Sequence, residues 1–208
     1  MRFQARQPSD PRPCPAWYPV ARNGAHFDVG NVRAAPATIK RLDPAGYLAA
    51  IPALAELLRD AVEGGASVNF LADVTTDEAA TWWRDRVTQV ADGSITALVA
   101  RDREGGIVGS TLLMRATQPN APHRAEIGKV LVHRRARRQG IARALMDAAE
   151  TVARDDGRWL LILDTHTGTE AEAMYLALGW QRVGEIPNHS LTADGTLKSA
   201  TYFWKDLR

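Results

Sequence analysis

The stretch from Val130 to Arg143 restricts the fold of this chain more than any other part of the sequence. Apolar residues end at Val132, four of the five positions 134–138 are arginine, and Gly140 directly precedes a segment with helical periodicity. Apolar side chains that recur three and four positions apart line one face of a helix. In this segment they are Ile141, Leu145, Ala148, Ala149 and Val152. The pattern predicts a buried strand, a short basic loop and an amphipathic helix in direct succession.

Such a strand–loop–helix unit can bind a diphosphate. The first turn of a helix leaves backbone N–H groups without acceptors, and the helix dipole adds partial positive charge at the same place. Gly140 and the small Ala142 let a ligand approach the main chain. We therefore predict an anion-binding site at the start of the helix that follows Gly140.

Two other interpretations of the arginine run remain. A short basic run can be a targeting or nucleic-acid-binding segment, or a solvated face without a ligand. Neither explains why a glycine and a small residue stand where a helix must begin. The anion site is therefore the favoured interpretation.

Apolar periodicity and turn residues divide the rest of the chain into helices and strands. The other predicted helices cover 44–62, 75–92 and 170–178. The predicted strands cover 38–42, 95–101, 107–117, 125–133, 159–163, 181–186 and 200–205. A hairpin in the first half, followed by alternating strands and helices, is typical of a mixed sheet. The predicted class is α/β, with helices flanking one central sheet.

Several predicted ends carry recognisable signals. Pro44 suits the first turn of a helix, and Gly64 should stop that helix. Thr75 and Glu78 have the spacing of a capping box. Gly179 is expected to cap the helix 170–178.

Composition excludes several classes of protein. The chain has 208 residues, 45% of them hydrophobic, and a net charge of only +2, which does not indicate a nucleic-acid-binding protein. The single cysteine, Cys14, excludes a disulfide framework, and the five histidines show no metal-binding spacing, so we expect no metal. No run approaches the ~20 apolar residues of a membrane span. We therefore expect a cytoplasmic protein, monomeric or homodimeric, without a membrane partner.

The N-terminal residues differ from the rest. Five prolines stand among positions 8–19, a density that disfavours both helix and sheet. The segment also lacks the continuous apolar run of a signal peptide. We expect residues 1–31 to form a flexible extension and 32–208 to form one domain.

The run Arg137, Arg138, Gln139, Gly140, Ile141, Ala142 resembles the Arg/Gln-x-x-Gly-x-Gly/Ala signature of the GNAT superfamily of N-acetyltransferases. The resemblance implies the acyl-CoA N-acyltransferase fold, with a mostly antiparallel sheet, and acetyl-CoA as co-substrate. It implies that the backbone amides from Gln139 to Arg143 hold the coenzyme diphosphate. It also implies that the main chain of Leu131 and Val132 pairs with the pantetheine arm.

A closer resemblance extends over about 57–207. Short runs in this range resemble the tabtoxin resistance group of the superfamily, whose substrate is a β-lactam amino acid. The runs are 64–68, 70–73, 124–126, 163–165, 171–173, 184–187 and 194–195. The resemblance implies a small-molecule amine as acceptor, with antibiotic resistance as one role.

Acetyl transfer to an amine needs a proton acceptor for the amine and a proton donor for the leaving thiolate. Tyr175 matches the family position of the tyrosine near the coenzyme sulfur, so it is the candidate donor, although it could simply pack against the sheet. Glu126, on the strand that leads to the predicted anion-binding site, is the candidate base, although it could be a surface carboxylate. Asp164, expected to end a buried strand, could bind the substrate amine or cap the following loop. A water chain could replace either carboxylate as base.

The sequence departs from the family at two positions. Gly168 stands where the family often has asparagine, and His133 where it often has proline. We expect the acceptor site to be built by the first two helices with segments 64–73 and 187–194. The alternatives are acetylation of a protein or peptide amine, or a CoA-binding regulatory module without turnover.

Overall fold

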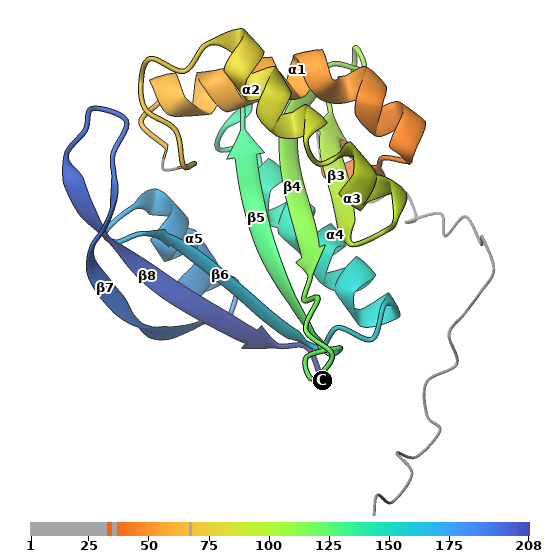
Figure 1. Cartoon of the computed structure of the whole chain (residues 1–208), viewed down its shortest axis with the longest axis vertical. Coiled ribbons are helices and arrows are strands. Elements are labelled where there is room, and N and C mark those ends of the chain that lie inside the picture. The colour runs from red at the N-terminus through yellow and green to blue at the C-terminus, as the bar shows by residue number, and fades with distance from the viewer. Residues whose placement is uncertain (1–32, 35–36, 67) are drawn as a thin grey trace, which may run out of the picture.

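The computed structural model describes residues 33–34, 37–66 and 68–208. The expected extension 1–31, with Cys14, lies outside the described residues. Within the described part, the predicted mixed α/β class is confirmed. One sheet is flanked by helices on both faces (Figure 1).

Among the described residues, the sheet contains eight strands in the order β1-β2-β3-β4-β5-β6-β8-β7. All neighbouring strands are antiparallel except β5 and β6, which are parallel. The strands are β1 (Arg33–Ala34), β2 (Ala37–Arg41), β3 (Ile95–Arg101), β4 (Ile107–Arg115), β5 (Arg124–Val132), β6 (Leu160–His166), β7 (Gln181–Leu191) and β8 (Leu197–Asp206). The predicted 95–101 strand is reproduced at both ends, and β3 and β4 form the predicted hairpin.

The helices cover the two faces of the sheet separately. One face carries α1 (Pro44–Glu63), α2 (Thr76–Arg84) and α3 (Val87–Ala91), which share an apolar core with β3 and β4. The other face carries α4 (Ile141–Asp155) and α5 (Glu170–Ala177), whose core includes Leu145, Tyr175 and Phe203. Figure 1 shows α1 and α2 lying across the end of β3–β5, with α4 behind these strands.

The predicted helix 75–92 is wrong in one respect, because it is two helices. Its capping box is present, with Thr75 and Glu78 bonded reciprocally. The break comes at Arg86, whose side chain donates to the carbonyl oxygen of Trp82. A continuing α-helix would use that oxygen for the amide of Arg86, which instead donates to the carbonyl oxygen of Trp83 at 3.1 Å. The side chain thus takes the place of a backbone bond and a new short helix begins.

Three other ends differ from prediction. The C-cap of α5 is Leu178, and Gly179 lies one position beyond it with φ +82°, the left-handed conformation that ends many helices. Strand β6 continues to His166, three residues past its predicted end. Strands β7 and β8 extend almost to the turn at Thr192–Thr196, because they pair along most of their length.

The pairing between β5 and β6 ends early. It comprises three residue pairs, the last of which joins Glu126 to Ile162. Beyond that pair the two strands separate, and Figure 1 shows them diverging toward α1 and α2. The divergence divides the sheet into a larger part, β1–β5, and a smaller part, β6–β8–β7.

Candidate active site

The predicted anion site is at the start of α4. Gly140 is the N-cap with φ +78° and ψ 2°, and no side chain caps the helix. The first backbone bond of the helix runs from the amide of Ala144 to the carbonyl oxygen of Gly140 at 3.0 Å. Within the described part of the chain, the amides of Ile141, Ala142 and Arg143 therefore have no acceptor. A Cβ built on Gly140 would meet no atom within 4 Å, so the space in front of these donors is open. Unpaired amides facing open space fit a diphosphate.

The loop before Gly140 has an unusual backbone. Arg138 has φ +62°, and a short 3-10 helix η1 (Arg134–Ala136) precedes it. Arg138 and Gly140, two positions apart, thus both have left-handed conformations directly before the first turn of α4.

Most arginines of this loop have protein partners. Arg134 contacts Asp60 and Glu63 on α1, and Arg135 contacts Asp102 between β3 and β4. Nε of Arg137 donates to the carbonyl oxygen of Val132 at 3.3 Å. The arginines hold the loop against its neighbours.

Asp60 is the buried partner in this arrangement. Its carboxylate accepts from both the backbone amide and Nε of Arg134, each at 2.8 Å, and Nε2 of His133 lies 3.6 Å away. Burial alone would raise the pKa of Asp60, but the hydrogen bonds from Arg134 and the charges of His133 and Arg134 outweigh it and lower the pKa. Asp60 therefore fixes the point at which β5 turns into the anion-binding loop.

The predicted residues Leu131 and Val132 lie at the end of β5. They pair with Ser110 and Gly109 of β4 on one side. On the side toward β6, no strand of the described chain pairs with β5 beyond Glu126. An extended ligand could add to this edge as a strand does, and the edge leads directly to the anion site.

Tyr175 is buried on α5, with 5% of its surface exposed. Its ring packs against Trp180 and Phe203, with centroids 6.1 Å and 6.0 Å apart. Burial raises the pKa of Tyr175 well above its usual value, and the negative charge of Asp164 raises it further. Its hydroxyl therefore keeps its proton at neutral pH.

Glu126 and Asp164 lie on neighbouring strands beside the point of divergence. Glu126 pairs with Met114 of β4 and Ile162 of β6, and Asp164 pairs with Tyr202 of β8. Asp164 does not end a buried strand as predicted. It is exposed in the interior of β6, because β6 has no neighbour on the β5 side at that position.

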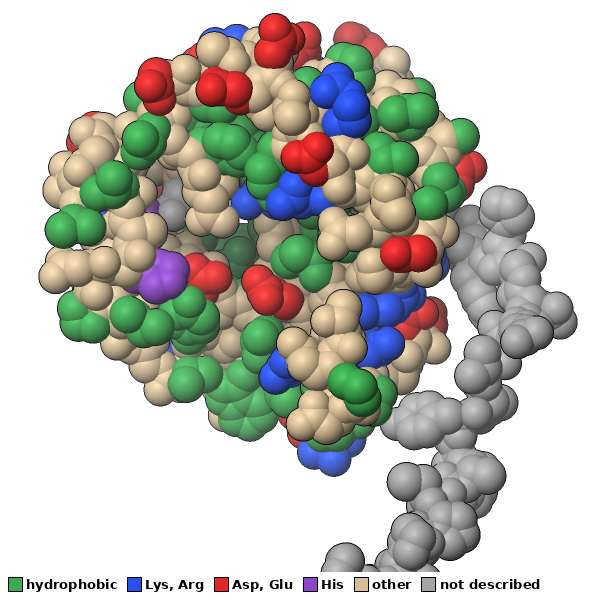
Figure 2. Space-filling model, viewed as in Figure 1, with side chains coloured by type: hydrophobic (Ala, Val, Ile, Leu, Met, Phe, Trp, Pro, Cys, Tyr) green, Lys and Arg blue, Asp and Glu red, His purple; other side chains and the backbone are tan. Residues whose placement is uncertain are grey.

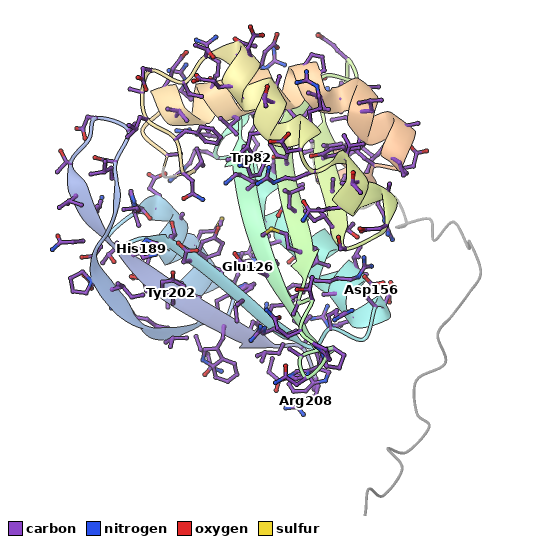
Figure 3. The ribbon with its side chains drawn as sticks, in the orientation of Figure 1. Trp82, Glu126, Asp156, His189, Tyr202 and Arg208 are labelled. Carbon is purple, nitrogen blue, oxygen red and sulfur yellow. The ribbon has the colours of Figure 1, made fainter. Side chains whose placement is uncertain are left out.

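The environment of Glu126 raises its pKa. Desolvation by the surrounding protein is the main cause, and the negative charge of Asp164 is the next. Glu126 reaches solvent at the wall of a depression of about 190 Å³. Figure 3 shows it beside the opening between β5 and β6, with Trp82 on the opposite side. A raised pKa makes a carboxylate a stronger base.

Lys129 is not among the site residues predicted from the sequence. A bulge in β5 lies between the pairs Ser110–Leu131 and Leu112–Gly128, and Lys129 has φ +52° within it. Without the bulge, strand alternation would direct Lys129 toward α4. Instead its Nζ donates to the carbonyl oxygen of Val68 at 3.1 Å. The only signal in the sequence is a lysine between apolar residues of a predicted strand.

The pKa of Lys129 is lowered to about 8. Burial is the main cause, and the like charge of Arg86 adds to it, while Asp164 and Glu126 act in the opposite direction. Lys129 and Glu126 on β5 and Asp164 on β6 thus share one electrostatic environment.

The segments expected to bind the acceptor are also brought together. The amide of Ala72 donates to the carbonyl oxygen of Ala193 at 2.9 Å, which joins the loop after α1 to the β7–β8 turn. His189 near this turn bonds to the hydroxyl of Tyr202 at 2.9 Å. Figure 2 shows a hollow on this face, with basic side chains above it and acidic and histidine side chains below and beside it.

Residues 33–34, 37–66 and 68–208 contain no group of three His, Cys, Asp or Glu residues that could hold a metal ion. None of their helices is long and apolar enough to cross a membrane.

Known proteins resemble this chain in sequence and in fold. The sequence model of the acetyltransferase (GNAT) family matches residues 53–180. The structure is similar to an N-acetyltransferase from Staphylococcus aureus Mu50, with 18% identity, 83% of this chain and 99% of that chain covered, and a TM-score of 0.68. It is similar to yncA from Salmonella typhimurium, solved with its cofactor acetyl-CoA, with 20% identity, 83% and 94% covered, and a TM-score of 0.65.

A third similar structure is a ribosomal-protein-alanine N-acetyltransferase from Brucella melitensis. It has 25% identity, with 81% of this chain and 99% of that chain covered, and a TM-score of 0.64. The three chains are covered almost completely, so the likeness concerns whole domains.

Proposed function

The chain belongs to the acetyltransferase (GNAT) family, and we propose that it transfers the acetyl group of acetyl-CoA directly to the amine of a small molecule. One observation carries the proposal. Beyond Glu126 the edge of β5 is unpaired in the described chain, and it leads into the uncapped start of α4. An extended coenzyme arm and its diphosphate require these two features in this order.

Acetyl-CoA would supply an acetyl group already activated as a thioester. In the proposal the amides from Gln139 to Arg143, with Gly140, Ile141 and Ala142 between them, hold its diphosphate. The side chains of Arg137 and Arg138 border this site, and the main chain of Leu131 and Val132 aligns the arm. Holding both reactants in place supplies a large part of the rate enhancement.

Two side chains handle the protons. Glu126 accepts a proton from the acceptor amine, directly or through water, as the nitrogen forms its bond to the carbonyl carbon. Tyr175 provides a proton to the sulfur as the carbon–sulfur bond breaks. The raised pKa of Glu126 makes it a stronger base than an ordinary carboxylate. Asp164 orients the amine or replaces Glu126 as base.

A peptide amine is the second candidate acceptor. It is supported by the 25% identity to a chain named as a ribosomal-protein-alanine N-acetyltransferase. The hydrogen bond that joins the loops at Ala72 and Ala193 favours the small molecule, because an open groove for a peptide would need these two segments apart. Within that class we retain an amino-acid-like or β-lactam acceptor, with antibiotic resistance as one role, and a cytoplasmic location, since a chain with one cysteine gains nothing from an oxidising compartment.

The test is an acceptor screen that measures release of the coenzyme thiol. Amino acids, β-lactam amino acids, polyamines, aminoglycosides and short peptides are incubated with the full chain and acetyl-CoA. We expect release that depends on a small-molecule amine and falls strongly in Glu126→Gln. Release with peptides alone would favour the second candidate. No release with any amine, together with no acetyl-CoA binding by calorimetry, would overturn the proposal.

A further inference from the structure

Two cations contact one indole ring on the α2 side of the cleft. Cζ of Arg86 lies 3.2 Å from the centroid of the Trp82 ring, and Nζ of Lys129 lies 4.5 Å from it. Trp82 is held in turn by edge contacts with Phe70 and Trp83, at centroid distances of 6.2 Å and 4.9 Å. The ring is therefore a fixed platform that positions both cations.

Neither cation forms an ion pair with a carboxylate of the described chain. Lys129 donates to the carbonyl oxygen of Val68 and Arg86 to that of Trp82. By contrast, Lys205, which is also partly buried, has the carboxylate of Glu150 at 2.7 Å. Two cations close to one another and partly removed from water repel each other unless an anion joins them. The pair therefore presents unused donors to whatever enters the cleft.

The backbone carries strain to place Lys129 there. A non-glycine residue at φ +52° is uncommon and costs free energy. The bulge that imposes this conformation moves the side chain from the α4 face to the cleft face of β5. Strain of this kind is frequent where a side chain contacts a ligand.

Carboxylates occupy the other side of the same space. Glu126 is three positions before Lys129 on β5, or roughly 10 Å along a strand, and Asp164 is on β6. Both act electrostatically on Lys129. Figure 2 shows the basic and acidic side chains on separate sides of the hollow. This separation matches a small molecule that carries both charges.

We propose that the acceptor is an amino-acid-like zwitterion whose carboxylate binds Lys129 and Arg86 beside Trp82 while its amine faces Glu126. The inference rests on the proposed acetyl transfer and narrows its acceptor. Lys129 and Arg86 would determine specificity, since they would contact the substrate away from the reacting nitrogen. Polyamines and aminoglycosides, which carry only positive charge, would be poor acceptors.

The titration of Lys129 supports this assignment. Three charged groups act on Lys129: Arg86 between α2 and α3, Asp164 on β6 and Glu126 on β5 itself. The pKa of Lys129 is about 8. The side chain is therefore charged at pH 7 and loses its charge above pH 8. A bound carboxylate would raise this pKa, so affinity for an anionic acceptor should fall as the pH rises through 8 and above.

The experiment compares matched acceptors in the wild-type protein. The best amino acid from the screen is assayed beside its carboxamide, which keeps the amine and removes the negative charge. We expect kcat/KM for the acid to exceed that for the carboxamide by about 10- to 100-fold, mostly through KM, as loss of a charge-assisted hydrogen bond does. Equal values would overturn the inference while acetyl transfer itself stood.

Substitutions test whether the preference for the acid depends on Lys129. Lys129→Met should lower kcat/KM for the acid about 10- to 100-fold and change that for the carboxamide less than about threefold. Lys40→Met, which removes an exposed cation on β2, should change neither. If Lys129→Met lowered kcat/KM for the acid and for the carboxamide by the same factor, the inference would be contradicted. If that variant does not fold, Lys129→Arg, which keeps the charge, should retain the preference for the acid.

Discussion

The two ends of the cleft differ in whether their cationic side chains are paired with carboxylates. At the end proposed to bind the coenzyme, Arg134 and Arg135 pair with carboxylates of α1 and of the β3–β4 turn, and the unpaired donors are backbone amides. At the end proposed to bind the acceptor, Lys129 and Arg86 have no carboxylate within ion-pair distance in the described chain, and the pKa of Lys129 is lowered. The unpaired donors are main-chain amides at one end and charged side chains at the other.

Main-chain and side-chain donors give different kinds of specificity. Amides at the start of a helix bind any diphosphate of suitable shape, whichever side chains surround them. Unpaired charged side chains instead discriminate among ligands, because a ligand without the opposite charge leaves them unpaired. Substitutions at the two ends should therefore affect different measurements.

The largest effect is expected at the main-chain end. Gly140→Glu places a carboxylate where the diphosphate would lie, so acetyl-CoA should lose at least about 100-fold in affinity and no longer raise the melting temperature. The substitution also strains a residue at φ +78° by about 1–2 kcal/mol. Gly157→Glu is the matched control, since Gly157 has φ +70° and open space at the other end of α4. An unchanged melting shift in Gly140→Glu would refute the anion site.

The next effect is expected at Tyr175, the buried tyrosine of α5. Tyr175→Phe removes the proposed proton donor and should lower kcat about 100-fold with little change in coenzyme affinity. Tyr47→Phe is the control, because the Tyr47 hydroxyl is also buried but donates to the carbonyl oxygen of Trp83 at 2.9 Å. That variant should lose about 1 kcal/mol of stability and keep its kcat. Equal turnover in Tyr175→Phe and wild type would remove Tyr175 from the mechanism.

A smaller effect is expected where α1 holds the loop. Asp60→Asn weakens the contacts with Arg134 and should lower acetyl-CoA affinity about tenfold and stability by about 2 kcal/mol, while the exposed Glu63→Gln changes stability by less than about 1 kcal/mol. The lowered pKa of Asp60 means that its stabilisation is present above its unfolded pKa and is lost as the pH falls through its folded pKa. Urea unfolding at pH 7 and near pH 3 measures this. A difference between Asp60→Asn and wild type that persists undiminished at low pH would contradict it.

The smallest effect has the opposite sign. The folded pKa of Lys129 lies below its ordinary value of 10.5, so holding this charge destabilises the fold below pH 8, and the cost disappears as the pH rises toward 10.5. Lys129→Met should therefore gain about 1 kcal/mol at pH 7, after loss of its hydrogen bond to Val68. Urea unfolding at pH 7 and pH 10 should show the gain shrinking with pH. Destabilisation at pH 7 would mean that Lys129 is a structural residue.

The sequence predicted the main-chain end better than the side-chain end. The loop before Gly140 is continuous in sequence and its glycine reports a backbone conformation directly, so the strand, turn and helix could all be placed. Strands β3 and β4 were equally clear, because a glycine-rich turn joins two apolar runs. The family match then agrees with the class and chemistry expected from these segments.

The acceptor end could not be predicted in the same way. Lys129 reaches the cleft only because β5 contains a bulge, and nothing in its neighbours shows that the alternation shifts there. The break between α2 and α3 depends on the contact of Arg86 with Trp82, which a pattern of apolar residues does not report. Asp164 was misplaced because the end of a strand depends on its partner, and β8 extends β6 to His166.

The three-pair contact between β5 and β6 has a consequence for how such a protein can diverge. Because the opening is created where main-chain pairing stops, its width does not depend on which side chains line it. Mutation can therefore exchange those side chains one at a time without closing the gap or altering the turn before α4. New acceptor preferences could then arise through a few substitutions in a lineage that retains its donor.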